Sequence, residues 1–460
     1  MTDKDTTASG AAATFAAIRL HRRKFLTGSA AVLGGTFLPM PAVLGQAKEF
    51  DGVVLNGASF THGFQNEIKA QLPEFEALTG IKVNLDLQAF AIYNQRMDLE
   101  LSTQGSSYDF CNITFPFAGR WVGAGWMTPL EEFTSDPAVT PPDWAPEDFI
   151  GGAQAAFTGS DGKVYGYSWV AGVQMLAAAR FDLVEKAGLA MPKTFDEMLA
   201  VCEATNSPEC AAFANDKLHH WAWPPYLMGF GGRIFQDIAA GDLNPVLDSA
   251  ESIAAADFYA RLLRDFSPPG VLSYTDEQVM RGQFAGRINM RTMSLDWLLP
   301  IGKSDESKTR DTVRYASFPG GPAGSFPGVN SQGYGIPVGA KNKRAAWEFI
   351  KWSLSKENIR RLALEKNQLS VTRKSVMEDP EFKAKLEVNG QDVAAIYMGA
   401  LEQAGAKGYM KYRTLPVYPQ VGEKISKAIE RITSGQALAE EAMKAANQEV
   451  IDDLKKAGAL

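Results

Sequence analysis

The stretch "VVLNGASFTHGFQNEIKAQLPEFEALTGIKVNLDLQ", residues 53–88, decides the fold. It opens with the β-rich run 53–55. Apolar residues then recur at helical spacing between Gln65 and Thr79, and Gly80 follows as a helix C-cap. Pro73 lies inside this helical pattern, so we expect a kink there. Apolar and polar residues alternate over 83–87, which predicts a second strand.

The same pattern is repeated once more along the chain. We expect a helix over 91–103 and a third strand over 108–113. An order of strand, helix, strand, helix, strand is typical of a parallel sheet that carries helices on its faces. The sequence therefore predicts an α/β fold.

The remaining chain is long enough for a second core. Roughly 410 residues follow residue 47, which is more than one hydrophobic core usually serves, so two lobes are expected. Capping boxes at 194–197 and 275–278 predict two helix starts. Apolar periodicity predicts helices over 345–354, 421–432 and 440–454, whereas the Gly- and Pro-rich run 318–328 predicts a loop that passes between the lobes.

The first 47 residues have the features of an export signal. Arg22 and Arg23 precede a weakly apolar run that prolines interrupt, and small residues occupy positions 45 and 47. The pattern resembles a twin-arginine (Tat) signal cleaved after Ala47. The alternative, a membrane anchor, needs about 20 strongly apolar residues. We therefore expect a periplasmic protein that starts at Lys48 and is not inserted in the membrane.

Net charge excludes nucleic acid as a partner. Residues 1–47 carry five Lys or Arg and two Asp, so their removal takes the formal charge from -7 to -10. An acidic protein repels the phosphates of nucleic acids and of anionic lipids.

The chain is poor in cysteine. A disulfide between Cys202 and Cys210 is one interpretation, because an oxidising compartment would allow the short loop between them to close. Two reduced thiols are the alternative. Too few Cys and His are present for a typical zinc site, and neither a P-loop nor a dinucleotide fingerprint occurs, so no metal or cofactor is expected.

Aromatic residues at turn positions are the main candidates for a binding site. They are Phe115, Phe117, Trp169, Trp221, Trp223 and Trp297. Flat rings cover the C–H faces of sugars and polyols, while Asp, Asn, Gln and Arg side chains bind the hydroxyls. The alternative for each ring is a place in the core. No motif of a hydrolase stands out, although a pair of catalytic carboxylates is not excluded by the sequence.

Six blocks in a fixed order resemble a known family. They are "PEFEALTGIKVNLDL", "YDFCNITFPFAGRWVGAGWMTPLEEF", "DGKVYGYSWVAGVQMLAAARFDLVEKAGLAMPKTFDEML", "MRGQFAGRINMRTMSLDWLLP", "VNSQGYGIPVGAKNKRAAWEFIKWSLS" and "SGQALAEEAMKAANQEVIDDL". In this order the chain resembles the family 1 extracellular solute-binding proteins of carbohydrate type. These are periplasmic receptors that deliver a ligand to the permease of an ABC importer.

The resemblance implies two lobes of a periplasmic-binding-protein fold (type II), with the ligand in the cleft between them. Lobe 1 would contain residues 48–163 and 318–354, and lobe 2 residues 164–317 and 355–460. The hinge would cross near 162–164, 316–320 and 353–356. Such receptors act as monomers and are not enzymes.

The resemblance also implies which residues contact the ligand. They are Ser59, Phe60, Gln65, Thr114, Phe115, Phe117, Trp169, His220, Trp221, Trp223, Arg291, Asp296, Trp297, Asn330, Gln332 and Arg413. The expected ligand is a sugar, a polyol or a small oligosaccharide. Two alternatives are another solute, such as a phosphorylated polyol or a sugar acid facing Arg291 or Arg413, and a secreted carbohydrate-active enzyme.

Overall fold

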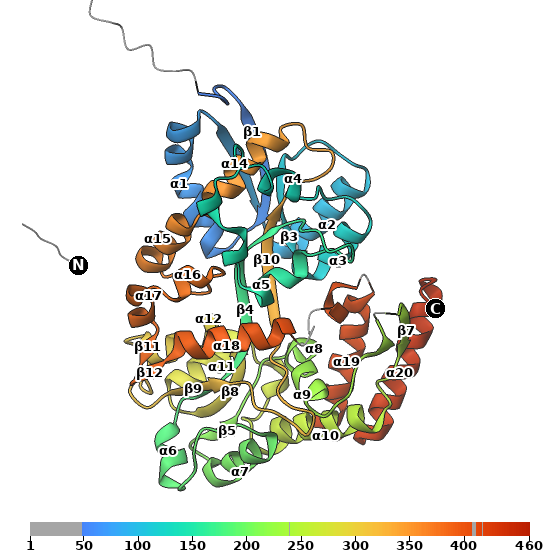
Figure 1. The fold of residues 1–460 in the computed structure, drawn as a ribbon. Helices are drawn as coiled ribbons and strands as arrows, with labels where there is room; N and C mark the ends of the chain where they lie inside the picture. The colour runs from blue at the N-terminus through green and yellow to red at the C-terminus, as the bar shows by residue number, and fades with distance from the viewer. Residues whose placement is uncertain (1–47, 239, 407–410, 416) are drawn as a thin grey trace, which may run out of the picture. The chain divides into compact units, whose positions relative to one another are not determined.

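The computed structural model describes residues 48–460, apart from 239, 407–410 and 416. The predicted signal, residues 1–47, lies outside the described residues. The chain folds around a mixed sheet in the order β2-β1-β3-β10-β4-β8-β5, with β9 paired to β4 (Figure 1).

The strands and helices predicted from 53–113 are confirmed. They are β1 (Val54–Phe60), α1 (Gly63–Thr79), β2 (Lys82–Gln88), α2 (Phe90–Ser102) and β3 (Phe110–Thr114). Both β2 and β3 run parallel to β1. Gly80 ends α1 with φ 82°, a left-handed conformation that glycine adopts without strain. A side chain at Gly57 of β1 would collide with the Phe110 ring of β3, which explains the glycine there.

Two central strands connect the two halves of the sheet. β10 (Val329–Gly335) is antiparallel to β3 and to β4 (Tyr167–Ala178). β4 pairs with β10 over residues 167–173 and with β8 (Ile288–Ser294) and β9 (Arg314–Ser317) over residues 174–178. One strand therefore changes partners halfway along its length, as Figure 1 shows near its centre.

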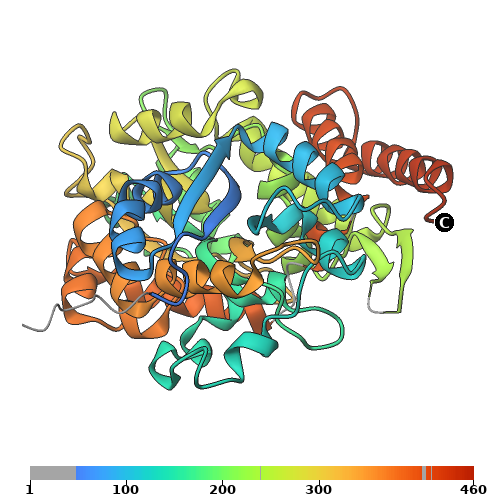
Figure 2. The ribbon, with the colours of Figure 1, turned by 90° about the horizontal axis from the view of Figure 1, so that it is seen from above.

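Helices cover both halves of the sheet. α14 (Lys343–Ser353) and α15 (Lys356–Lys366) pack beside α1, and the Phe349 ring of α14 stacks on Phe110 at 4.1 Å between centroids. In the other half, α19 (Tyr418–Thr433) and α20 (Ala439–Lys456) lie side by side and pack on α10 (Ala250–Asp265), as both views show (Figure 2). The helices predicted over 345–354, 421–432 and 440–454 are confirmed.

The other elements are short or peripheral. They are α3 (Phe115–Gly123), α4 (Glu131–Thr134), η1 (Pro142–Trp144), η2 (Pro146–Asp148), α5 (Gly151–Gln154), η3 (Ala155–Phe157), α6 (Phe181–Lys186), α7 (Phe195–Thr205), β5 (Ala211–Phe213), α8 (His219–Ala222), α9 (Pro224–Gly229), β6 (Phe235–Asp237), β7 (Asp242–Pro245), η4 (Val271–Ser273), α11 (Asp276–Phe284), α12 (Leu295–Leu298), α13 (Pro300–Lys303), α16 (Lys374–Met377), α17 (Pro380–Lys385), β11 (Glu387–Val388), β12 (Gln391–Asp392), α18 (Val393–Ala406) and η5 (Lys411–Thr414).

Both predicted helix starts occur, but only one has a complete capping box. At α11 the Thr275 hydroxyl accepts from the Gln278 backbone, and the Gln278 side chain accepts from the Thr275 backbone. At α7 the Thr194 side chain caps Glu197, but the Glu197 carboxylate binds the Lys193 backbone instead. The predicted loop is confirmed, since no strand or helix lies between β9 and β10.

The predicted disulfide is wrong, because Cys202 and Cys210 are both free and buried. Cys202 faces the core from α7, and Cys210 ends a tight turn in which its backbone bonds to Ser207 in both directions. Burial raises the pKa of Cys210 to about 11, so this thiol stays protonated at neutral pH.

Two further observations concern membrane spans and metal ligands. Over residues 48–460, with the gaps given above, no helix has the length and apolar character of a membrane span. In the same described part of the chain, no three His, Cys, Asp or Glu side chains are grouped as metal ligands.

Candidate ligand-binding site

A cleft of about 1030 Å³ lies beside the N-terminal half of β4. Four segments supply most of its walls: the first residues of α1 with the turn before it, strand β4, the segment from α12 to α13, and α15 with the chain that leaves it. Met280 of α11 and Lys385 of α17 complete them. Its lining residues are His62, Gly63, Phe64, Trp169, Val170, Met280, Leu295, Asp296, Trp297, Leu299, Pro300, Lys303, Ser304, Ile359, Leu362, Asn367, Gln368, Leu369, Ser370, Val371 and Lys385. Trp169, Asp296 and Trp297 are the predicted site residues among them.

Aromatic rings form one wall of the cleft. Trp169 stacks on Phe64, with ring centroids 4.9 Å apart and planes inclined by 20°, and its indole N–H donates to Asn112 Oδ1 at 2.7 Å. Its side chain is almost fully buried, so its position is fixed. Trp297 adds a half-buried ring from α12. Of these three rings, Trp297 has the accessible face for the C–H groups of a ligand, whereas the buried rings of Trp169 and Phe64 make the wall rigid.

Asp296 places a carboxylate in the same cleft. The hydroxyl of Ser370 donates to its Oδ1. Its side chain is open to the cleft, yet protein atoms surround it closely, and this desolvation raises the pKa of the Asp296 carboxyl above its usual range. A carboxylate can accept hydrogen bonds from several hydroxyl groups at once.

The two lysines of the cleft are already engaged. Lys303 Nζ donates to the Glu387 carbonyl at 2.7 Å. Lys385 Nζ donates to the Leu364 carbonyl and to Asn367 Oδ1. Because both ammonium groups already donate hydrogen bonds to protein oxygens, neither lysine indicates a dedicated anion-binding site.

Buried polar atoms without a partner gather around Trp169. Gln65 accepts a hydrogen bond from Tyr334 at 2.5 Å through Oε1, but its Nε2 has no partner among the residues that the structure describes. The same holds for Asn112 Nδ2, for Gln332 Oε1 on the strand next to Val170, and for Ser59 Oγ at the end of β1. An unpaired buried polar atom costs about 1–3 kcal/mol, so such a group is suited to meet ligand hydroxyls or water.

Arg413 forms a second group with two predicted aromatic residues. Its guanidinium carbon lies 4.5 Å from the centroid of the Phe115 ring and 4.1 Å from that of Trp221. The side chain is 6% exposed and makes no hydrogen bond or ion pair within the described residues. Gln174 Nε2 donates to the Trp221 carbonyl at 3.2 Å. None of these residues lines the 1030 Å³ cleft.

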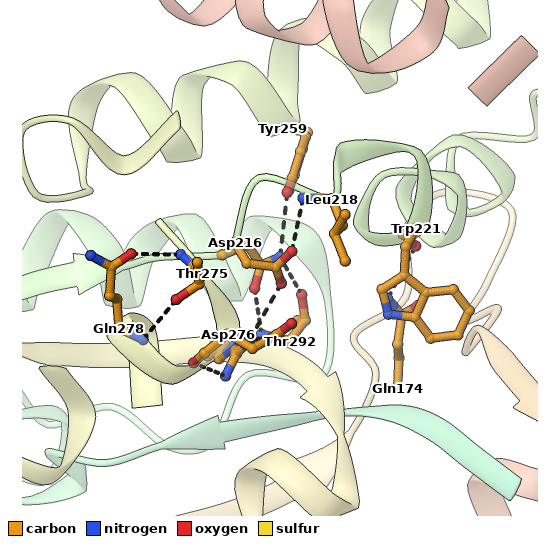
Figure 3. A network of polar contacts seen from close by, with 11 residues as sticks. Gln174, Asp216, Leu218, Trp221, Tyr259, Thr275, Asp276, Gln278 and Thr292 are labelled. Atoms are coloured by element: carbon orange, nitrogen blue, oxygen red, sulfur yellow. Dashed lines mark hydrogen bonds and ion pairs between the residues drawn. The ribbon is translucent and has the colours of Figure 1, made fainter. Parts of the chain in front are cut away.

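Arg291 lies in a buried ion-pair network and not in the cleft. Its partners Asp216 and Asp276 are labelled in Figure 3. Its guanidinium binds Asp276 and Asp216, the latter at 3.3 Å, and the whole side chain is buried. Burial, and next the charge of Asp216, raises the pKa of Asp276 to about 6. The two aspartates neutralise the charge of Arg291, although its Nε has no partner among the described residues, so its role here is to join β8 to the start of α11.

Four other predicted residues have structural contacts. Thr114 donates to Asn94 Oδ1 at 2.6 Å, and Asn330 Oδ1 accepts from the Gly172 backbone at 3.1 Å. Phe117 packs on Trp121, and Trp223 is fully buried.

Phe60 and His220 complete the predicted set. The Phe60 ring packs against Trp169 at 5.9 Å and supports the aromatic wall from behind. A ring nitrogen of His220 lies 3.3 Å from the Ser426 hydroxyl. Burial, and next the charge of Arg413, lowers the pKa of His220 to about 4, so this ring is neutral at physiological pH.

Sequence reasoning missed His62, Phe64 and Ser370. His62 and Phe64 lie between the predicted residues Phe60 and Gln65, in the turn that joins β1 to α1. The "THGF" of that turn was a usable signal, because such turns form the edge of a parallel sheet where ligands bind. Ser370 follows α15 with no pattern around it that indicates a site.

Comparisons with known proteins agree with the predicted family. The model of the family "Bacterial extracellular solute-binding protein" matches residues 57–359. A mannitol-binding protein of Pseudomonas aeruginosa is 21% identical over 393 residues, 80% of this chain and 85% of its own length. An erythritol/L-threitol-binding protein of Mycolicibacterium smegmatis is 20% identical over 77% of this chain and 76% of its own length.

A solved structure shows the same fold. It is an ABC transporter solute-binding protein from Agrobacterium radiobacter in complex with ribitol, with a TM-score of 0.73 and 23% identity over 88% of this chain and 99% of that one. The α/β fold expected from residues 53–113 is thus confirmed as a periplasmic-binding-protein fold. Since the family model covers well over half of the chain, the protein belongs to the bacterial extracellular solute-binding proteins, and it is a binding protein rather than an enzyme.

Proposed function

We propose that this protein captures a sugar, a polyol or a small oligosaccharide in the 1030 Å³ cleft and delivers it to the permease of an ABC importer. The observation that carries the proposal is the pairing of a fixed aromatic wall, Trp169 on Phe64, with the carboxylate of Asp296. The mannitol, erythritol/L-threitol and ribitol binding of its relatives supports the same class of ligand.

Capture needs no chemical step. Rings cover the C–H faces of the ligand, and Asp296 together with the unpaired amides of Gln65 and Asn112 binds its hydroxyls. A dissociation constant of about 1 μM requires about -8 kcal/mol. Several hydrogen bonds to charged or buried groups, at about 1.5–3 kcal/mol each, and the burial of one ring face reach that value even after the cost of closing the cleft.

The ligand is held between two lobes in this proposal. Residues 48–163 and 318–354 form lobe 1, and 164–317 and 355–460 form lobe 2. The change of partners within β4, at residues 173–174, supports moving the first crossing from 162–164 into this strand. Residues 164–173, with Trp169, then move with lobe 1, whereas Asp296 moves with lobe 2. A ligand that contacts both lobes favours the closed form, because it binds that form more tightly than the open one.

The same proposal covers export and assembly. Residues 1–47 direct the chain through the twin-arginine route to the periplasm, where it acts as a monomer. Its partner there is the membrane permease, and ligand exchange with that permease completes the transport cycle.

Isothermal titration and thermal unfolding test the proposal. D-Mannitol, ribitol, erythritol and maltose are suitable first ligands, with glycine betaine as an unrelated control. We expect at least one of the four to bind with a dissociation constant in the micromolar range or below and to be recovered unchanged. If none binds, or if the ligand is converted on incubation, the proposal is wrong.

Arg413 supports a second candidate, a sugar acid or a phosphorylated polyol. Its guanidinium is buried without a counter-ion in the described residues, and a buried charge of this kind is stabilised by an anion. Residues 405–416 contain no Asp or Glu in the sequence that could serve. D-Gluconate and mannitol 1-phosphate would then bind more tightly than D-mannitol, and Arg413→Gln would remove the difference. Equal or weaker binding of the anions excludes this candidate.

A further inference from the structure

In His62, a residue of the cleft, the fold fixes which ring nitrogen accepts a hydrogen bond and which one can donate. It is the N-cap of α1, with extended backbone at φ -152° and ψ 153°. Its Nδ1 accepts a hydrogen bond from the backbone N–H of Phe64 at 3.1 Å. A backbone N–H can only donate, so Nδ1 must carry a lone pair. In the neutral ring the proton is therefore on Nε2.

Two aromatic neighbours hold this ring in place. Trp169 meets it at 4.9 Å between centroids with planes inclined by 63°, and Phe60 meets it at 6.0 Å and 78°. Burial lowers the pKa of His62 to about 4, and no charged group contributes to that shift. The ring is thus neutral at physiological pH, and its tautomer is set by the helix cap.

The side chain of His62 that carries this Nε2–H belongs to a residue of the cleft wall. His62 lines the 1030 Å³ cleft, and within the described part of the chain its Nε2 has no hydrogen-bond partner. The charged groups that line the same cleft are Asp296, Lys303 and Lys385, and both ammonium groups are engaged by protein oxygens. The cleft therefore combines a fixed acceptor, Asp296, with a fixed neutral donor.

We propose that His62 determines specificity by donating its Nε2–H to an oxygen of the ligand, while the cap of α1 holds the ring in the one tautomer that can do so. This inference rests on the proposed function. It makes the site selective for a ligand with a hydroxyl or ether oxygen at that position over one in which the oxygen is replaced by hydrogen. A deoxy analogue would leave the Nε2–H buried without a partner, which is strongly unfavourable.

Nitrogen-15 NMR of the histidine rings tests the tautomer directly. Loss of one signal set in His62→Asn assigns the ring among the four histidines of the chain. In the free protein we expect a protonated Nε2 and a bare, hydrogen-bonded Nδ1 between pH 5 and 8, and a shift of the Nε2 signals on saturation with D-mannitol or ribitol. A proton on Nδ1, titration near pH 6.5, or Nε2 signals that ignore a bound ligand would each overturn the inference.

Two substitutions distinguish the role of His62 as a hydrogen-bond donor to the ligand from its role as the N-cap of α1. Asn and Asp both cap helices well, but only Asn also donates. We expect His62→Asn and His62→Asp to melt within a few degrees of each other without ligand, and His62→Asp to bind the ligand at least tenfold more weakly than His62→Asn. The gap should persist in 0.5 M salt, which screens the added charge.

The outcomes keep the two proposals apart. If D-mannitol or ribitol binds and both variants bind equally well, the role of His62 is wrong and the proposed function stands. If none of the sugars or polyols binds the native protein, the proposed function fails and the inference fails with it.

Discussion

Trp223 and Trp297 look alike in the sequence, as loop-side rings, but the structure separates them. Trp223 is fully buried, whereas Trp297 is half-buried and lines the cleft. We expect Trp223→Ala to lower the free energy of unfolding by about 3–5 kcal/mol, because it leaves a cavity. Trp297→Ala should change that stability little and weaken ligand binding by about 1–3 kcal/mol, through the loss of apolar contact.

Denaturant unfolding and calorimetric titration of the two variants give both quantities. If Trp297→Ala binds the ligand with full affinity, the ring of Trp297 does not contact the ligand. A folding loss in Trp297→Ala as large as that in Trp223→Ala would assign both rings to the core.

The limits of sequence reasoning are clearest at single residues. Family blocks located the segments of the site, so Trp169, Asp296 and Trp297 were predicted at the cleft. The same blocks could not tell which side of a strand a side chain occupies. Every residue of β8 is buried, and Arg291 lies on the side of the strand where Asp216 and Asp276 bind it. Only the pairing of β8 with β4 and β5 decides that direction.

At the scale of the element, the start of α11 combines a capping box with the buried pair of Asp276 and Arg291. An Asp carboxyl titrates near 4 in an unfolded chain, while in the folded state burial raises the pKa of Asp276 to about 6. Between these pH values the folded state binds more protons than the unfolded one, so stability falls as the pH rises. The contribution is fully present below pH 4 and is lost above pH 6.

Asp276→Asn should flatten this part of the stability profile, because the amide keeps an acceptor for Arg291 and does not titrate. Between pH 4 and 6, the free energy of unfolding should fall on the order of 1–3 kcal/mol more for the native protein than for Asp276→Asn. Urea unfolding at a series of pH values measures it, and Glu277→Gln, on the exposed side of the same turn, is the control. Parallel profiles for the native protein and Asp276→Asn would show that the carboxyl does not titrate in this range.

Helices and strands with a clear period of apolar residues, or with a recognisable capping residue, could be predicted from the sequence. α1, β1, β2 and the C-terminal helices follow from spacing alone, since each buries one apolar face. The disulfide was mispredicted because loop length says nothing of direction, and Cys202 is turned into the core by α7. β10 was not predicted as a strand, because "VNSQGYG" has neither alternation nor β-branched residues beyond Val329 and gains its place by pairing with β3 and β4.

At the scale of the whole molecule, we expect export to depend on the proposed twin-arginine signal. Replacing Arg22 and Arg23 with Lys keeps the positive charge and removes only the motif. We expect the variant to accumulate as precursor in the cytoplasm, whereas Arg19→Lys, outside the pair, should be exported normally. Fractionation and immunoblotting of both variants measure this. Normal periplasmic yield of the double variant would mean that another export route is used.

In the proposed function, hinge closure is the property that links the binding site to transport. The strand β4 carries Trp169 of the cleft in one half and pairs with β8 and β9 in the other, so bending near residues 173–174 would move the aromatic wall relative to Asp296. A ligand bound between them favours the closed form. Saturation should therefore decrease the radius of gyration in small-angle X-ray scattering and raise the melting temperature. At a ligand concentration of 100 times Kd the stabilisation is about 2.7 kcal/mol. Asp296→Ala, which removes the carboxylate from one wall, should need more ligand for the same compaction but reach the same end point. If saturating ligand raises the melting temperature and leaves the radius of gyration unchanged, the ligand binds to a rigid cleft, and recognition by the permease cannot depend on hinge closure.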